Sequence, residues 1–445
     1  MIKMGSLIDK IKAKLREVFA NYKYHDYLKF LDENQFNSRK RIVEHQEKRL
    51  RELIEFAFQH IEFYKEFSKK NNIAPKNIRT LEDLKKLPVM SKQKYRTLFP
   101  EKIVDPDANE EDLYLNSTSG STGTPFKFYN SKELRGHKAA RSTRFYRWAN
   151  CEFGDPMVKI WGISHLGLKK KIYHKFFKNQ LLINAFNLNR NNFHNYYKKI
   201  KKKEPILLEA YTSSAYAFSL ILEENNLELN IPSTILSGET LFDFQKELIE
   251  EKFNTEIYNR YGCREFGAIA QHCSHHTGLH INEEDFIIEI IDDNHQTVEK
   301  GTTGNIVVTC LNNYVMPFIR YKMDDLGSFL EKECPCGRKL KMLKTVEGRV
   351  TDMIYSPSGK HISLYFFALT FQGLNEYVNE FQVVQKKGSK QLIIKIVPTE
   401  EYNHEVEKRI KKEINEMDNA FNINIDLVDK IPLEPNGKKK YLKKI

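Results

Sequence analysis

The sequence has 445 residues, of which 40% are hydrophobic and 12% aromatic, values typical of a globular protein with two or three domains. No run approaches the ~20 consecutive apolar residues of a membrane span, and six cysteines are too few for a disulfide scaffold, which excludes a membrane-spanning protein and a disulfide-rich secreted domain. The formal net charge of +12 comes from lysines interleaved with glutamates, which favours a basic surface suited to anionic small molecules or membranes and predicts no specific nucleic-acid partner.

The first predicted elements are helices. Residues 1–19 are charged throughout and lack the apolar run and the cleavage site of a secretory signal, which predicts a cytoplasmic protein. Apolar residues recur at spacings of three and four between Leu50 and Tyr64, the pattern of a helix that packs one face against a core. We therefore predict a helical start over residues 1–70.

The next distinctive segment is STSGSTGTP at 117–125. Gly120 and Gly123 permit backbone conformations closed to other residues, and a turn that points successive N–H groups inward forms an anion-binding nest. A Ser/Gly/Thr run is also typical of a solvated loop, and no GK[ST] follows it as in a Walker loop. The residues alone leave a phosphate loop and a solvated loop as alternatives.

Short apolar runs then alternate with helical stretches. Runs at 157–163, 286–291 and 305–310 predict strands, with a helix at 215–224 between them, and this alternation predicts an α/β fold with layers. The pattern changes near Gly348, and a strand-like run at 392–397 and a charged helix around 405–416 follow. We predict a large layered α/β domain at 1–348 and a small α+β domain at 349–445.

Thiol and imidazole side chains are grouped in the later part of the predicted large domain: Cys273, His275, His276 and His280 fall within eight residues, and Cys334 and Cys336 follow some sixty residues later. Thiolates with imidazole are the ligands that a structural zinc ion prefers, in a tetrahedral set of three cysteines and one histidine. Buried thiols beside exposed histidines are the alternative.

Six motifs resemble, in order, those of the adenylate-forming superfamily, which includes acyl-CoA synthetases, luciferases and nonribosomal adenylation domains. They are STSGSTGTP (117–125), SGE (237–239), NRYGCREFG (259–267), IRYKMDDLG (319–327), GRVTDMI (348–354) and PLEPNGK (432–438). Within the superfamily, YGCREFG, GLHINEEDF, IRYKMDDLG and CPCGR are most similar to phenylacetate–CoA ligases and their relatives in surface-polysaccharide gene clusters.

The resemblance implies an activity and an architecture. An enzyme of this type uses ATP to convert a carboxylic acid into an acyl-AMP with release of pyrophosphate, and then transfers the acyl group to coenzyme A. The polysaccharide-cluster relatives imply an alternative acceptor, an amine of a sugar or glycan precursor. The large domain is then the adenylation domain, and the small one is a mobile lid. Homodimers are common in this branch, so a homodimer is also expected.

The resemblance also implies roles for individual residues. Glu265 binds Mg²⁺, Asp325 accepts both ribose hydroxyls, and Lys438 brings positive charge to the reacting carboxylate and phosphate. The implied nucleotide contacts are Ser117, Thr118, Ser119, Gly120, Ser121, Thr122, Gly123, Gly238, Glu239, Asn259, Tyr261, Gly262, Asp325 and Arg349.

Several positions depart from the family pattern or stay open. The family's threonine in the third motif is Arg264 here, so either the guanidinium replaces a phosphate contact or this corner of the site is rearranged. Asp324 is a second carboxylate beside Asp325, and the family spacing favours Asp325. Similar cysteines in relatives support a zinc site made of Cys273, His280, Cys334 and Cys336, with His276 as the substitute for His280. The acyl pocket is expected near residues 211–216.

Overall fold

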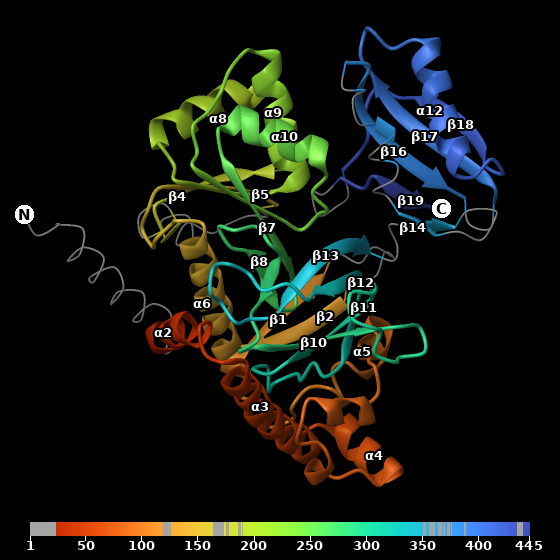
Figure 1. The fold of residues 1–445 in the computed structure, drawn as a ribbon. Coiled ribbons are helices and arrows are strands. Elements are labelled where there is room, and N and C mark those ends of the chain that lie inside the picture. Colours follow the sequence, from red (N-terminus) through yellow and green to blue (C-terminus); the bar gives the residue numbers. More distant parts are fainter. Residues whose placement is uncertain are drawn as a thin grey trace, which may run out of the picture.

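The computed structural model describes residues 24–118, 126–162, 173–174, 178–185, 188, 190–349, 353–355, 361–363, 367, 370–371, 374, 376–386, 389–433 and 439–445. Figure 1 shows a large mixed α/β body and a smaller unit that holds the C-terminus beside it. The predicted α/β fold class is confirmed, with a small α+β unit after the large one.

A mixed sheet of eleven strands runs through the large body in the order β10-β11-β12-β13-β9-β8-β7-β6-β5-β3-β4. The parallel half comprises β3 (Met157–Trp161), β4 (Gln180–Asn184), β5 (Leu207–Tyr211), β6 (Ser233–Ser237) and β7 (Glu256–Cys263). The antiparallel half comprises β8 (Gly267–His272), β9 (Leu279–Ile281), β10 (Phe286–Ile291), β11 (Gly304–Cys310), β12 (Tyr321–Leu330) and β13 (Met342–Arg349). The strands predicted at 157–163, 286–291 and 305–310 are confirmed.

Three helices cover one face of the parallel half, and the end of a fourth with the residues after it packs on the other. Helices α8 (Arg190–Lys203), α9 (Thr212–Glu224) and α10 (Asp243–Phe253) share one apolar core with residues of β3, β5 and β6. On the opposite face, the residues after α6 (Lys132–Trp148) pack against alternate residues of the same strands. Every residue of β5 and β6 is buried, as expected for parallel strands between two helical layers.

The N-terminal helices are α2 (Tyr24–Asn34), α3 (Arg39–His60), α4 (Glu62–Asn71) and the later α5 (Lys92–Leu98). Of these, α2 packs against α6, and the others pack against the antiparallel half. Helix α3 begins where the Ser38 hydroxyl accepts a hydrogen bond from the backbone of Arg41, and its residues Leu50, Leu53 and Ile54 enter the largest core. Helices therefore occupy the described part of the predicted helical start, while residues 1–23 lie outside it.

Strands β1 (Leu113–Thr118) and β2 (Phe126–Ser131) form a separate antiparallel hairpin, and the glycine-rich segment connects them. The C-terminal unit contains the pair β14 (Met353–Tyr355) and β15 (His361–Ser363), and a sheet in the order β18-β17-β16-β19. These four strands are β16 (Val378–Gln385), β17 (Gln391–Pro398), β18 (Asn422–Leu427) and β19 (Leu442–Lys444), and α12 (His404–Met417) shares their apolar core. The predicted boundary at 348/349 falls at the end of β13.

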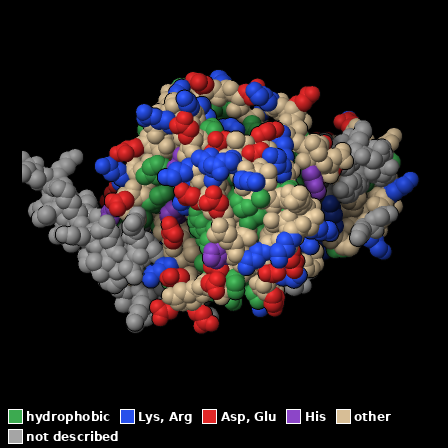
Figure 2. All heavy atoms as spheres, turned by 90° about the horizontal axis from the view of Figure 1, so that it is seen from below, with side chains coloured by type: hydrophobic (Ala, Val, Ile, Leu, Met, Phe, Trp, Pro, Cys, Tyr) green, Lys and Arg blue, Asp and Glu red, His purple; other side chains and the backbone are tan. Residues whose placement is uncertain are grey.

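Two surface properties follow from the sequence. On the face shown in Figure 2, basic and acidic side chains are intermixed and apolar patches lie between them, as the interleaved charges predict. Within the described ranges, no helix combines the length and apolarity that crossing a bilayer would require.

Buried ion pairs join α6 to the segment between β9 and β10. Arg141 pairs with Asp285, and Arg144 pairs with Glu284 at 2.8 Å, with all four side chains fully buried. Asp285 also lies 3.2 Å from His137 Nδ1. Burial alone would raise the pKa of Asp285, but Arg141 and His137 outweigh it and hold that pKa well below its usual range.

We expect Asp285→Asn to lower the free energy of unfolding by about 3 kcal/mol at pH 7, because it leaves the Arg141 guanidinium buried without its counter-charge. A depressed carboxyl pKa stabilises the fold above the unfolded pKa of about 4 and loses this contribution as the pH falls below it. The difference between wild type and variant should therefore shrink between about pH 5 and pH 3. Urea unfolding across that range measures this difference, with Glu33→Gln, at an exposed carboxylate, as the control. Equal losses of unfolding free energy in the two variants would contradict the role given to Asp285.

Candidate functional site

Two of the motifs meet at one edge of the large sheet. Parallel strands place their carboxyl ends at the same edge, and β5, β6 and β7 end there at Tyr211, Ser237 and Cys263. SGE continues from β6, and the motif at 259–267 spans the end of β7 and the turn after it. Ligands of open α/β sheets bind outside such carboxyl ends, so this edge is the candidate site.

The tyrosine of the 259–267 motif contacts the predicted ribose carboxylate. The Tyr261 hydroxyl donates a hydrogen bond to Asp325 Oδ2 at 2.7 Å, which joins β7 to β12. Burial and the Asp325 charge raise the pKa of Tyr261 well above its usual value, so it stays a neutral donor. Of the two neighbouring carboxylates, Asp325 is therefore the one that contacts Tyr261, while Asp324 has left-handed backbone with a φ of 61°.

Close packing holds the rest of that motif in place. Asn259 and Gly262 also lie on β7. A Cβ atom on Gly262 would lie 2.4 Å from the carbonyl oxygen of Gly267, so only glycine fits there. The strand thus turns sharply at the point where Arg264 and Glu265 follow.

The predicted Mg²⁺ ligand, Glu265, lies at the base of this turn and is only 3% exposed. Its Oε1 atom accepts a hydrogen bond from the Tyr321 hydroxyl at 3.1 Å and lies 3.9 Å from Lys92 Nζ. A buried carboxylate with no closer cation among the described residues suits a hard divalent ion, which prefers carboxylate oxygen. Sequence reasoning missed Lys92, because a lysine in this lysine-rich chain carries no distinguishing signal.

SGE forms the turn after β6. Gly238 has a φ of 86°, in the left-handed region that favours glycine. The Glu239 carboxylate accepts hydrogen bonds from the Ser213 backbone at 2.6 Å and from its hydroxyl at 2.9 Å. A carboxylate there satisfies free N–H groups at the start of α9 and complements the helix dipole. Glu239 therefore caps a helix, and its nucleotide contact stays a prediction.

The glycine-rich segment is described only at its start. Ser117 and Thr118 end β1, whereas Ser119, Gly120, Ser121, Thr122 and Gly123 lie outside the described residues. The Thr118 hydroxyl is buried and has no hydrogen-bond partner in the described part of the chain. Such a donor is available to a ligand, which is consistent with a phosphate loop.

The lysine and arginine predicted from the lid are only partly placed. Lys438 lies outside the described residues. Arg349 belongs to β13 by its backbone, directly opposite Asp325 on β12. The next lysine, Lys439, forms an ion pair within the C-terminal unit, where its Nζ atom lies 2.6 Å from Glu380 Oε1.

The C-terminal unit contacts the large body next to the candidate site. The Tyr441 hydroxyl accepts a hydrogen bond from Gln245 Nε2 at 3.3 Å, and Gln245 belongs to α10. Phe242, three residues after Glu239, is buried in the same core as the C-terminal strands. The segment that follows Lys438 is thereby anchored near the edge where SGE lies.

A buried charged cluster below this edge was not predicted. Glu209 on β5 bonds Arg260 on β7, Lys159 Nζ at 2.8 Å and the Tyr146 hydroxyl at 2.8 Å. Burial alone would raise the pKa of Glu209, but Lys159 and Arg260 outweigh it and keep that pKa well below its usual range. Because Arg260 immediately precedes Tyr261, this cluster fixes the strand that carries the nucleotide motif.

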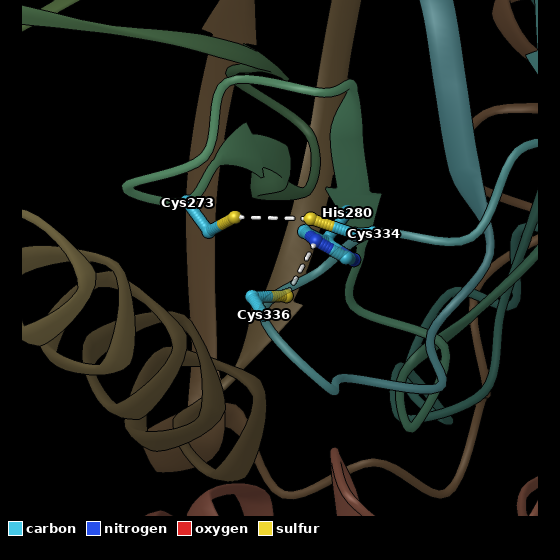
Figure 3. Close-up of side chains that lie close together, drawn as sticks. All are labelled: Cys273, His280, Cys334 and Cys336. Carbon is cyan, nitrogen blue, oxygen red and sulfur yellow. Dashed lines mark hydrogen bonds between the residues drawn. The ribbon is translucent and has the colours of Figure 1, made fainter.

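The four predicted zinc ligands come together (Figure 3). The sulfur atoms of Cys273 and Cys334 are 3.5 Å apart, His280 Nε2 is 3.4 Å from the Cys336 sulfur, and all four ligand atoms lie within 4.8 Å of one another. Tetrahedral zinc with bonds of about 2.3 Å to sulfur and about 2.0 Å to nitrogen places its ligands about 3.5–3.8 Å apart, so this set fits.

The structure also separates the two candidate histidines and places the cluster in the sheet. His276 lies 2.7 Å from Glu256, outside the set, so His280 supplies the imidazole. Cys273 and His280 come from the β8–β9 region, whereas Cys334 and Cys336 lie between β12 and β13. The cluster thus spans the contact between β9 and β13, where only two residue pairs are in register.

Comparison with known proteins places this geometry in context. Residues 354–444 match the family described as the CapK C-terminal domain. Protein CapK from Staphylococcus aureus is 27% identical, in an alignment that covers 98% of this chain and 96% of CapK. A phenylacetate-coenzyme A ligase from Thermus thermophilus is 24% identical, over 69% of this chain and 70% of that protein.

Solved structures share the fold. A 2-hydroxyisobutyryl-CoA ligase in the postadenylation state, in complex with 2-HIB-AMP, superposes with a TM-score of 0.76 and 18% identity, over 91% of this chain and 90% of that one. The same ligase with 2-HIB-AMP and CoA in the thioesterification state gives a TM-score of 0.64 and 18% identity, over 92% of this chain and 91% of that one.

Proposed function

We propose that this chain, which is homologous to CapK and to phenylacetate-CoA ligases and has the fold of adenylate-forming CoA ligases, uses ATP to activate a carboxylic acid as its acyl-AMP. The observation that carries the proposal is the convergence of Tyr261, Asp325 and buried Glu265 at the carboxyl edge of the sheet. A nucleoside triphosphate needs a ribose acceptor and a metal-binding carboxylate in one place, and these residues supply both.

The chemistry requires stabilisation of charge. A carboxylate oxygen attacks the α-phosphorus of ATP, the bond from phosphorus to the bridging oxygen breaks, and pyrophosphate leaves with the electron pair. Bound Mg²⁺, held by Glu265, would neutralise phosphate charge. The chain's own part is to hold the ribose with Asp325, to donate from the glycine-rich segment, and to bring the Lys438 ammonium to the developing charge.

We propose coenzyme A as the acceptor of the acyl group, because four sequence relatives are named phenylacetate-CoA ligases. An amine of a sugar or glycan precursor is the second candidate. It is supported by the match of residues 354–444 to the CapK C-terminal domain and by the alignment with CapK over 98% of the chain, against 69–74% for the four ligases.

We further propose a structural zinc ion at Cys273, His280, Cys334 and Cys336. The set offers the expected number and type of donors at tetrahedral spacing, so it needs no exchangeable ligand and takes no part in the chemistry. A cytoplasmic location, a homodimer and a lid at 349–445 stay proposals from the sequence.

Carboxylate-dependent exchange of labelled pyrophosphate into ATP tests the activation step. The assay should cover aromatic, aliphatic, hydroxy and amino acids without any acceptor. Exchange with one acid establishes adenylation and identifies the substrate class, after which coenzyme A and amino sugars are compared as acceptors. Absence of MgATP binding and of exchange across the panel would overturn the proposal.

We expect Arg264→Thr to lower the exchange rate about tenfold, mainly because it raises the KM for ATP. The Arg264 side chain is exposed at the site and makes no ion pair with any described residue, and a hydrogen bond from a charged donor to phosphate is worth about 1.5–3 kcal/mol. Steady-state exchange kinetics test this, with Lys132→Met as the control, because Lys132 at the start of α6 pairs with Asp112. Unchanged or improved kinetics would show instead that this corner of the site is rearranged.

A further inference from the structure

Lys138 on α6 reaches into the turn that carries Arg264 and Glu265. Its Nζ atom donates hydrogen bonds to the carbonyl oxygen of Glu265 at 2.5 Å, to that of Arg264 at 3.2 Å and to Asn130 Oδ1 at 2.8 Å. An ammonium group has three N–H donors, and three oxygen acceptors converge on this one. The lysine therefore fixes the peptide backbone on both sides of the predicted Mg²⁺ ligand.

Asn130 extends this contact to the glycine-rich segment. It lies on β2, is 2% exposed, and its Oδ1 atom also accepts a hydrogen bond from Asn116 Nδ2 at 3.3 Å. Its own Nδ2 atom donates to the Glu265 carbonyl oxygen at 3.4 Å. Asn116 on β1 immediately precedes Ser117, the first residue of the glycine-rich motif. Lys138 and Asn130 thus join the base of that motif to the turn that bears Glu265.

Gly267 makes room for the lysine. Its φ of 75° is in the left-handed region, and a Cβ atom at this position would lie 3.2 Å from Lys138 Cγ. That contact is tighter than side chains ordinarily allow. A glycine is therefore favoured at the end of the 259–267 motif because the Lys138 side chain passes beside it.

Partial burial of the Lys138 ammonium group without a counter-charge costs free energy. No carboxylate of a described residue forms an ion pair with Lys138, and its ammonium group is held by three neutral oxygen acceptors. A half-buried ammonium solvated by carbonyl oxygens, beside the expected triphosphate, contributes preorganised positive potential where negative charge must bind. Simple packing of α6 would be satisfied by a neutral side chain.

We propose that Lys138, with Asn130, is a positioning residue of the nucleotide site, which holds the Arg264–Glu265 turn in a fixed relation to the end of β1, where the glycine-rich motif begins. This inference rests on the proposed ATP-dependent function. No part of it depends on the acid or on the acceptor.

The test is the affinity of the full chain for MgATP, measured by isothermal titration calorimetry. We expect Lys138→Met to raise the Kd about tenfold or more, since it removes hydrogen bonds from a charged donor, and Lys138→Gln to give a smaller increase. Lys132→Met, on the same helix but paired only with Asp112 at 3.8 Å, should leave the Kd unchanged. The KM for the carboxylic acid should change less than that for ATP.

Thermal unfolding and a double substitution separate positioning from folding. If Lys138→Met does not fold, Lys138→Gln decides the question. The effects of Lys138→Met and Asn130→Ala on the Kd should be less than additive, because both break one connection. Wild-type affinity in a folded Lys138 variant would overturn the inference and leave the proposed function intact. Failure of the wild-type chain to bind MgATP would overturn both.

Discussion

Lys438→Ala is expected to lower carboxylate-dependent pyrophosphate exchange about 10²- to 10³-fold, the scale of losing one preorganised donor to developing charge. The Kd for MgATP should change little, because the lysine acts on charge that develops in the transition state. The prediction depends on the resemblance of PLEPNGK to the family's C-terminal loop, since Lys438 lies outside the described residues. The structure adds that Lys439 is already paired with Glu380.

The lysine-rich C-terminus supplies the control for this experiment. Lys443 lies five residues further along and is exposed on β19. Lys443→Ala removes the same charge from the same segment and should keep exchange near the wild-type rate. Equal losses in the two variants would mean that the overall charge of the segment matters, and that Lys438 has no specific role. Full exchange in Lys438→Ala would show that the lysine is misassigned.

The sequence predicted elements whose signal is local. Apolar runs identified the strands at 286–291 and 305–310, and the charged amphipathic stretch at 405–416 corresponds to α12. The grouping of Cys273, His280, Cys334 and Cys336 could also be predicted, because cysteine is rare in this chain and thiols with imidazole are chemically distinctive, while a bound zinc ion stays a proposal. In each case the residues that define the feature are close together in the chain or chemically distinctive.

The sequence could not predict contacts that depend on the order of strands. Glu209 and Arg260 meet because β5 and β7 flank β6, and nothing in either segment specifies that order. Lys138 is one of many lysines, and its three acceptors include two backbone carbonyl groups that leave no trace in the sequence. Glu239 was expected at the nucleotide, and its helix-capping contact with Ser213 depends on the adjacency of β5 and β6.

Removal of one zinc ligand is expected to have the largest effect on stability. Cys334→Ser should reduce bound zinc from about one ion per chain to near zero and lower the free energy of unfolding by about 4 kcal/mol or more, since binding at such a site contributes directly to folding. Zinc content by mass spectrometry and thermal unfolding measure both. Cys151 is buried outside the cluster, so Cys151→Ser controls for loss of a thiol and should retain the metal.

The position of the cluster predicts a second effect of the same substitution. The proposed zinc ligands come from both sides of the β9–β13 contact, which is held by only two residue pairs, Met342 with His280 and Leu343 with Leu279. Asp325 lies on the β12–β13 side of this contact and Tyr261 on the β7–β9 side, and the hydrogen bond between them crosses it. Loss of the metal should therefore also weaken MgATP binding, although no ligand of the metal touches the nucleotide site. Zinc that remains in Cys334→Ser would refute the metal assignment, whereas lost zinc with unchanged nucleotide affinity would show that the strand contact holds without it.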